Sequence, residues 1–278
     1  MSRRPVVRAA LVALLLPVVL LAGCSGQGAG NKTQLTVNGS TTVLPIAEVA
    51  AEMFHEQNPG LSVLVSGVGS SAGIESVTNG TCDIGTSSRE LTPQEKTLGL
   101  VDTPVAFDAI AVIVNPANSV KALSKQQAAD IFEGKITNWK QVGGPDEPIG
   151  LVNRDEASGT RDAFSKIVLG GAAFDSRAAV LPGTGQVRSV VADSVTAVGY
   201  ISLGFVDKSV KAVAVDGIVP SESTVADGTY PVSRLLHFFT KGKPSGLAKE
   251  YIDFVLSPAI QTKVVRDAGF LPIAEGGK

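Results

Sequence analysis

The sequence predicts an α/β protein in which strands and helices alternate along the chain. Two observations support this fold class. Short runs rich in Val, Leu and Ile recur from residue 34 onward, and amphipathic stretches with apolar residues three and four positions apart lie between them. Such alternation is typical of helices layered on mostly parallel sheets.

The predicted elements follow one another in a regular order. The predicted strands are continuous or alternating apolar runs, and they span residues 35–39, 61–68, 109–115, 149–153, 198–203, 210–215 and 234–240, with a further strand starting at 82. The predicted helices have amphipathic spacing or a start signal, and they lie at 42–58, from 158, at 246–256 and at 258–267, with capping boxes TPQE at 92–95 and SKQQ at 124–127.

The first residues have the pattern of an export signal. Three arginines precede an apolar run from Ala9 to Leu21 that is too short to span a bilayer comfortably. The run ends in LAGC, which resembles the bacterial lipobox and predicts lipidation of Cys24 after removal of residues 1–23. An ordinary signal peptide with an incidental cysteine is the alternative. In the lipoprotein interpretation, residues 24–32 form a flexible tether between the lipid and the folded body.

The composition of the chain argues against several kinds of binding partner. Removing residues 1–23 would remove three arginines and no acid from 24 basic and 26 acidic residues, which leaves a formal charge of −5. A mildly acidic body without basic runs argues against nucleic acid and against an anionic membrane surface. With Cys24 lipidated, Cys82 would be the only free cysteine, so neither a disulfide framework nor a CxxC zinc site is predicted. His55 and His237 are far apart, and no metal site is predicted.

Small hydroxyl residues gather at four predicted strand-to-helix junctions. These junctions are GSTTV (39–43), GVGSSAG (67–73), GTSSRE (85–90) and NRDEASGTR (153–161). The carboxyl ends of strands and the amino ends of helices meet there, where backbone N–H groups and hydroxyls can bind an anion. Each junction alone also fits an ordinary helix N-cap or turn. Together with Arg89, Arg154 and Arg161, they predict an anion site built from many neutral donors and one or two guanidinium groups.

Two enzyme classes compete with this interpretation. GSSAG at 69–73 matches the G-x-S-x-G pattern of a serine hydrolase, with Ser71 as nucleophile. The only downstream histidine is His237, which lies in the middle of an apolar strand run, so a core or sheet-edge histidine is the favoured interpretation. GVGSSAG also approaches G-x-G-x-x-G, but its last glycine comes one residue late, which makes a dinucleotide site a weak alternative.

Several segments together resemble the phosphate-binding proteins of bacterial phosphate-specific ABC transporters. They are NGSTTVLPI, GVGSSAGI, DIGTSSREL, IFEGKITNWKQVGG and NRDEASGTRDAF, and they occur in the family's order between about residues 34 and 273. The resemblance implies a type II periplasmic-binding-protein fold, with two α/β lobes joined by two crossovers and closing over the ion. Lobe 1 would comprise residues 33–107 and 236–278, and lobe 2 residues 108–235.

The resemblance also implies the ligand, the partners and the site. The protein would be a lipid-anchored, exported monomer without cofactor or catalysis that binds inorganic phosphate and delivers it to the permease subunits of an ABC transporter. By motif, the phosphate-binding residues would be Ser40, Thr41, Thr42, Ser70, Ser88, Arg89, Arg154, Ser158, Gly159 and Thr160.

One position departs from the pattern of some family members. They carry an aspartate where this chain has Ser88, and that carboxylate accepts the proton of hydrogen phosphate and repels sulfate. Asp155, Glu156 and Glu75 are alternative acceptors, although each also fits a solvated or capping carboxylate. We therefore expect weaker discrimination against sulfate. Sulfate or molybdate remains the alternative ligand.

Overall fold

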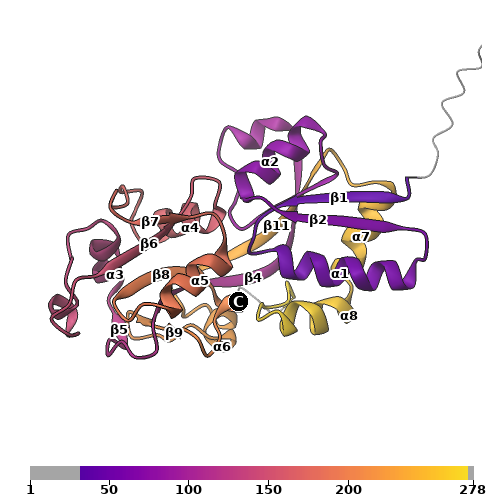
Figure 1. Ribbon diagram of the computed structural model, residues 1–278. Helices are drawn as coiled ribbons and strands as arrows, with labels where there is room; N and C mark the ends of the chain where they lie inside the picture. The colour runs from indigo at the N-terminus through magenta and orange to yellow at the C-terminus, as the bar shows by residue number, and fades with distance from the viewer. Residues whose placement is uncertain (1–31, 275–278) are drawn as a thin grey trace, which may run out of the picture. The chain divides into compact units, whose positions relative to one another are not determined.

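The computed structural model describes residues 32–274, and one mixed sheet runs through this part of the chain (Figure 1). Its strands are hydrogen-bonded in the order β2-β1-β3-β11-β4-β8-β6-β7, and β9 pairs with β4 beside this path. The strands are β1 (Gln34–Gly39), β2 (Ser62–Gly67), β3 (Ile84–Ser87), β4 (Leu100–Val114), β6 (Gly150–Arg154), β7 (Ala179–Leu181), β8 (Ala197–Ser202), β9 (Lys211–Ala212) and β11 (Ser233–Lys241). A separate small sheet pairs β5 (Ala122–Leu123) with β10 (Ala214–Val215).

Helices pack against the strands in both halves of the large sheet (Figure 1). The α-helices are α1 (Leu44–Gln57), α2 (Ser70–Asn79), α3 (Lys125–Phe132), α4 (Gly159–Ile167), α5 (Thr184–Ala192), α6 (Glu222–Ala226), α7 (Gly246–Val255) and α8 (Pro258–Ile260). The shorter turns are the 3₁₀ segments η1 (Glu95–Leu98), η2 (Trp139–Val142) and η3 (Leu203–Phe205), and the π segment η4 (Gln261–Val265).

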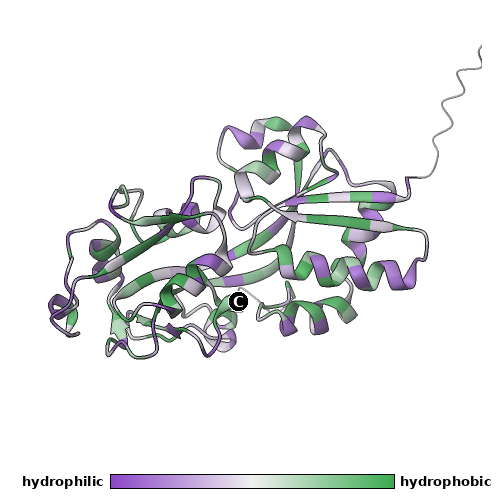
Figure 2. Cartoon of the chain, viewed as in Figure 1, coloured by the Kyte–Doolittle hydropathy of each residue, from purple (hydrophilic) through white to green (hydrophobic). Residues whose placement is uncertain are grey.

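Four buried hydrophobic clusters pack on the sheet, two in each half of the described chain. We call the part built on β1–β3 with α1, α2, α7 and α8 lobe 1, and the part built on β6–β8 with α3–α6 lobe 2. In lobe 1, β1 pairs in parallel with β2 and β3, and in lobe 2, β6 pairs in parallel with β7 and β8. Parallel pairing brings the carboxyl ends of neighbouring strands to one edge, which is where the hydroxyl-rich loops begin. Figure 2 shows the apolar residues concentrated on the strands and on one side of the helices.

Two antiparallel strands, β4 and β11, connect the lobes. They pair from Leu100 to Ala109 on β4, with a register shift between Leu236 and His237 on β11. Val105 of β4 is buried in the core of lobe 1, whereas Ile110 of the same strand is buried in the core of lobe 2. The predicted lobe boundaries at 107/108 and 235/236 fall within these strands and remain a prediction.

Several elements differ from the sequence-based expectations. The predicted strand at 210–215 is two short strands, because β9 pairs with β4 and β10 pairs with β5. The predicted helix at 258–267 begins as α8 but continues as the π segment η4. TPQE makes both capping-box hydrogen bonds, between Thr92 and Glu95, yet it starts only the short η1. SKQQ caps α3 as predicted.

The predicted export segment cannot be compared with the structure. The proposed signal peptide at 1–23, Cys24 and the tether up to residue 31 lie outside the described residues. No helix within residues 32–274 is long and apolar enough to cross a membrane.

Candidate functional site

The hydroxyl-rich loops of the two lobes are in direct contact. Thr42 Oγ1 of lobe 1 lies 3.1 Å from Thr160 Oγ1 of lobe 2. The Ser71 amide at the start of α2 donates to the carbonyl of Ala157, which precedes α4, at 3.1 Å. A Cβ atom on Gly159 would lie 2.3 Å from Ser70 Oγ. The structure therefore shows the lobes closed, with the beginnings of α1, α2 and α4 converging.

Glycine at the end of β1 determines the path of the first loop. Gly39 has φ 145°, and a Cβ atom there would lie 2.1 Å from the Thr86 carbonyl oxygen. Only a residue without a side chain fits this approach. It allows the Ser40 amide to donate to the Thr86 carbonyl at 3.0 Å and to Thr86 Oγ1 at 2.8 Å. The loop at 40–42 is thus fixed to the end of β3.

The hydroxyl groups of lobe 1 are buried and linked to one another. Ser40 Oγ accepts from the Thr42 amide at 3.1 Å, and Ser70 Oγ accepts from the Ser88 amide at 3.1 Å. Ser70 Oγ also lies 3.4 Å from Ser88 Oγ. Ser40, Thr42, Ser70 and Ser88 are each at most 2% exposed. These side chains can donate O–H groups into a site that excludes water.

Lobe 2 contributes the amino end of α4. Ser158 is the N-cap, and its Oγ accepts from the Arg161 amide at 3.2 Å. The first-turn amides of Gly159 and Thr160 have no intrahelical acceptor, because the residues four positions earlier are outside the helix. Together with the helix dipole they form a positive end that suits an anion.

Arg154 is the main positive charge at this end of α4. Its guanidinium donates to Thr184 Oγ1 at 3.2 Å, to Thr41 Oγ1 at 3.3 Å and to two backbone carbonyls, those of Leu181 and Pro182. Arg154 is 2% exposed. Among the ion pairs of residues 32–274 none involves it, and burial lowers the pKa of its guanidinium. A buried cation whose hydrogen-bond partners are all neutral leaves a positive charge for a ligand to compensate.

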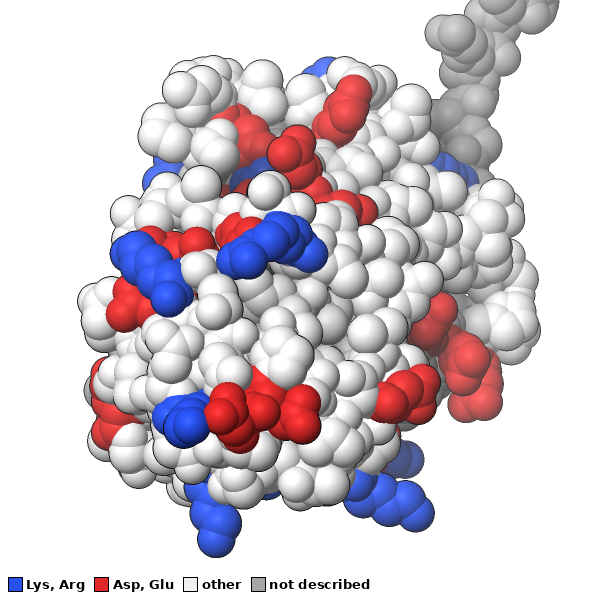
Figure 3. Space-filling view, turned by 60° about the vertical axis from the view of Figure 1, so that its left-hand side comes forward, with Lys and Arg blue, Asp and Glu red and all other residues white. Residues whose placement is uncertain are grey.

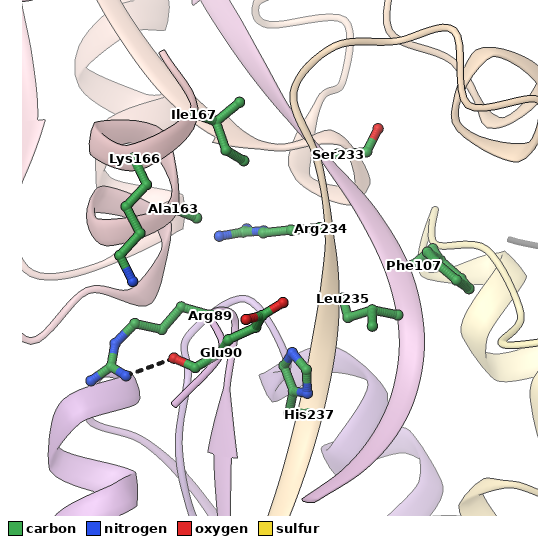
Figure 4. A pocket seen from close by; sticks show the side chains of 10 residues that line it. All are labelled: Arg89, Glu90, Phe107, Ala163, Lys166, Ile167, Ser233, Arg234, Leu235 and His237. Atoms are coloured by element: carbon green, nitrogen blue, oxygen red, sulfur yellow. Dashed lines mark hydrogen bonds between the residues drawn. The ribbon is translucent and has the colours of Figure 1, made fainter. Parts of the chain in front are cut away.

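The guanidinium of Arg89 is held by two acidic side chains. It binds both carboxylate oxygens of Glu95 at 2.7 and 2.8 Å and donates to Ser71 Oγ at 3.1 Å. Its Nε lies 2.8 Å from the Asp162 carboxylate on α4, so the ion pair joins the two lobes. Figure 4 shows the further bond from Arg89 to the Glu90 carbonyl. Arg89 thus already has two acidic partners, which argues against direct anion binding by its guanidinium, and its place in the site remains a prediction.

The remaining sequence candidates have other partners. Ser71 Oγ accepts a hydrogen bond from Arg89, whereas His237 Nδ1 bonds Asp102 on β4 at 2.9 Å. No hydrogen bond joins Ser71 to His237 in the described part of the chain, so the arrangement offers no base to Ser71. The guanidinium carbon of Arg161 lies 5.3 Å from the centre of the Phe174 ring.

Sequence reasoning missed two residues that touch the site. Thr184 at the start of α5 shares a 3.0 Å hydrogen bond with Thr41 and accepts from Arg154. Arg234 on β11 donates to the Ser88 carbonyl at 3.0 Å. The available signal for Arg234 was a charged residue beginning an otherwise apolar strand run. Thr184 follows a short strand in a loop that carries no recognised motif.

On the face in Figure 3, acidic and basic side chains are interspersed. Within residues 32–274, no group of three or more His, Cys, Asp or Glu side chains is placed to hold a metal ion. Arg154 and the start of α4 provide positive potential within the site.

Two α/β lobes joined by two crossover strands around a buried polar site define a solute-binding protein of the type II periplasmic-binding fold. The chain matches the PBP superfamily domain over residues 25–259. Phosphate-binding protein PstS of Bacillus subtilis is 39% identical over 246 residues, covering 87% of this chain and 81% of that protein. PstS of Borreliella burgdorferi is 30% identical, covering 95% of this chain and 98% of that protein. The chain belongs to the PstS family of phosphate-binding proteins within this superfamily.

Solved structures agree with this assignment. A phosphate ABC transporter substrate-binding protein from Clostridium perfringens, determined with bound phosphate, is 39% identical with a TM-score of 0.83 and covers 86% of this chain and 99% of that one. An ABC-type phosphate transport receptor from Vibrio cholerae is 37% identical with a TM-score of 0.73, covering 85% and 99%.

Proposed function

We propose that this protein binds inorganic phosphate outside the cytoplasm and delivers it to the permease of an ABC transporter. Family membership supports the ligand class, since the Clostridium perfringens relative was determined with bound phosphate. The predicted export signal and Cys24 support export and a lipid anchor. Carriage without chemistry fits Ser71, which has no hydrogen bond to a histidine within residues 32–274.

Arg154 is the observation that carries the proposal. A guanidinium that is 2% exposed and surrounded by hydroxyls and carbonyls is costly unless an anion joins it. The two lobes close directly over this charge. A ligand that completes the site must therefore be small enough to be enclosed and negatively charged.

The proposed ligand set is the predicted set without Arg89. Hydroxyl and amide donors would come from Ser40, Thr41, Thr42, Ser70, Ser88, Ser158, Gly159 and Thr160, with Arg154 as counter-charge. A charge-assisted hydrogen bond contributes about 1.5–3 kcal/mol net. Roughly eight to twelve are needed to offset dehydration of the ion and still leave micromolar affinity, about −8 kcal/mol. Donors from both lobes can supply this number, and those of one loop cannot.

Sulfate or molybdate is the second candidate ligand, and Ser88 is the observation in its favour. A serine adds no charge that would repel an anion without a proton. Calorimetric titration of residues 25–278, unfolded and refolded to remove carried-over ligand, tests both candidates. Tight phosphate binding with negligible sulfate heat supports the phosphate receptor. Equal binding makes it a general oxyanion receptor, and no heat with either ion refutes the anion site.

A further inference from the structure

A buried ion pair lies where the two crossover strands meet, directly beside the site. Arg234 of β11 and Asp108 of β4 are paired residues in the strand register. The Arg234 Nε and Nη2 atoms lie 2.9 and 2.7 Å from Asp108 Oδ2. The side chains are 4% and 0% exposed. Figure 4 shows Arg234 extending from β11 toward α4.

The two ends of this pair have different neighbours. The guanidinium faces the site loops, donating to the Ser88 carbonyl at 3.0 Å and to Thr42 Oγ1 at 3.5 Å. The carboxylate lies on the other side, where Asp108 Oδ1 accepts from Ser202 Oγ of β8 at 2.7 Å. The positive end of the pair is therefore nearer to the hydroxyls that surround the site than its negative end.

Because Arg234 and Asp108 are both buried, the balance between their charges strongly affects a nearby ion. Removing two charges from water costs several kcal/mol per ion, and a buried pair is weak evidence for a role in stability alone. Complete burial raises the pKa of Asp108 and lowers that of Arg234, so each charged form depends on the other. Because water is excluded, screening is weak and a change in one charge is felt by an ion only a few ångströms away.

We propose that Arg234 is a second positive charge of the anion site and that Asp108 sets how much of this charge the bound ion feels. The pair then acts on affinity in two opposing ways. Arg234 attracts the ion and holds the loops of Thr42 and Ser88, whereas Asp108 reduces the attraction so that the ion can be released. This proposal rests on the proposed function and assigns a positioning role that the sequence motifs did not indicate.

The test uses variants whose effects on affinity have opposite signs. Asp108→Asn leaves Arg234 charged without its counter-ion, so phosphate and sulfate should each bind about tenfold tighter or more. The double variant Asp108→Asn with Arg234→Gln removes both charges, and phosphate should bind at least about tenfold more weakly than to the wild type. Both variants should unfold at lower denaturant concentration. A purely structural pair would weaken binding in both variants, and that result overturns the proposal.

Asp102→Asn is the matched control. It removes the same charge from the same strand, about 20 Å away at ~3.3 Å per residue, which exceeds the Debye length of about 8–10 Å. Its phosphate affinity should stay within about twofold of the wild type, and a gain as large as that of Asp108→Asn overturns the proposal.

Arg234→Lys keeps the test decisive if Asp108→Asn does not fold. Lysine retains the charge but loses the planar hydrogen-bonding group. The role of charge is supported if Arg234→Lys binds phosphate with an affinity within about threefold of the wild type while the double variant loses much more affinity. Equal losses in the two refute it. Wild-type protein that binds neither ion refutes the proposed function itself, whereas wild-type binding without the gain in Asp108→Asn refutes this inference alone.

Discussion

Thr42 and Thr160 share a hydrogen bond of 3.1 Å between their Oγ1 atoms, and this bond joins the lobes at the centre of the site. Both residues are 1% exposed. Because one hydroxyl of such a pair donates and the other accepts, each can reorient toward an ion at little cost. Closure therefore brings together groups that remain available to a ligand.

Arg154→Met should reduce phosphate affinity by about 100-fold or more, because it removes the charge that the ion compensates. The unliganded protein should be as stable or more stable, since an unpaired buried charge is lost. Calorimetry and denaturant unfolding measure the two effects. Arg177→Met is the control, because Arg177 is exposed and paired with Asp175. Retained affinity in Arg154→Met would contradict the assigned role.

Gly159→Ala should obstruct closure without disturbing either lobe. The added Cβ would lie 2.3 Å from Ser70 Oγ and 2.9 Å from Ser88 Oγ, and both atoms belong to the opposite lobe. We expect phosphate affinity to fall by about tenfold or more with an unchanged unfolding midpoint. Gly185→Ala is the matched control in the first turn of α5, where an added Cβ meets nothing within 4 Å. Equal affinities in the two variants would show that closure tolerates the methyl group.

Asp162→Asn should speed ion release. It removes the interlobe partner of Arg89, while Glu95 still compensates the guanidinium. A partly exposed ion pair contributes up to about 1 kcal/mol, so release should be up to about fivefold faster. Exchange of radiolabelled phosphate measures this rate. The control is Asp146→Asn, whose partner Lys140 is exposed and lies in the same lobe; an unchanged rate in Asp162→Asn would mean that this ion pair does not hold the lobes.

Glu95 should make stability depend on pH in the acid range. Hydrogen bonding from Arg89 lowers the pKa of Glu95 from its ordinary value of 4.5 to about 2. The folded state therefore favours the carboxylate, and its contribution is complete above pH 4.5 and is lost as pH falls toward 2. Glu95→Gln should cost roughly 1–2 kcal/mol at pH 6 after allowance for solvent screening, and much less near pH 3. A cost that stays constant with pH would contradict this linkage.

Asp155→Asn should reduce selectivity for phosphate over sulfate. One carboxylate oxygen of Asp155 is buried and has no hydrogen-bond partner within the described chain, which makes it available to the proton of hydrogen phosphate. We expect a phosphate affinity at least about fivefold weaker, with sulfate affinity unchanged or tighter. Glu156→Gln, at the exposed neighbouring position, is the control. Parallel changes for both ions would exclude Asp155 as the acceptor.

Local sequence patterns correctly predicted those elements whose structure depends on residues close by in the sequence. SKQQ caps α3, and the apolar run at 109–115 largely coincides with the buried end of β4, because these features depend on neighbouring residues. The interruption of 210–215 was not predictable, since two different partner strands, β4 and β5, cause it. Long-range pairing of this kind leaves no local signal.

The same distinction applies to the site. Ser70 lies beside Ser88 and Thr42 lies beside Thr160, whereas the Arg89 guanidinium binds two carboxylates. Its second acidic partner, Asp162, is distant in sequence and lies on α4 of the other lobe. Whether an arginine binds a ligand or a carboxylate is decided by tertiary contacts, which no single motif contains.

The paired crossover strands restrict how the lobes can move. Two separate flexible linkers would allow sliding, tilting and rotation, but β4 and β11 are hydrogen-bonded to each other from Leu100 to Ala109. Such a ribbon resists shear and permits mainly twisting and bending, with the register shift beside Leu236 as its softest point. Closure then loses little rigid-body entropy, because few degrees of freedom were available to the open state. More of the ion's binding energy remains as affinity.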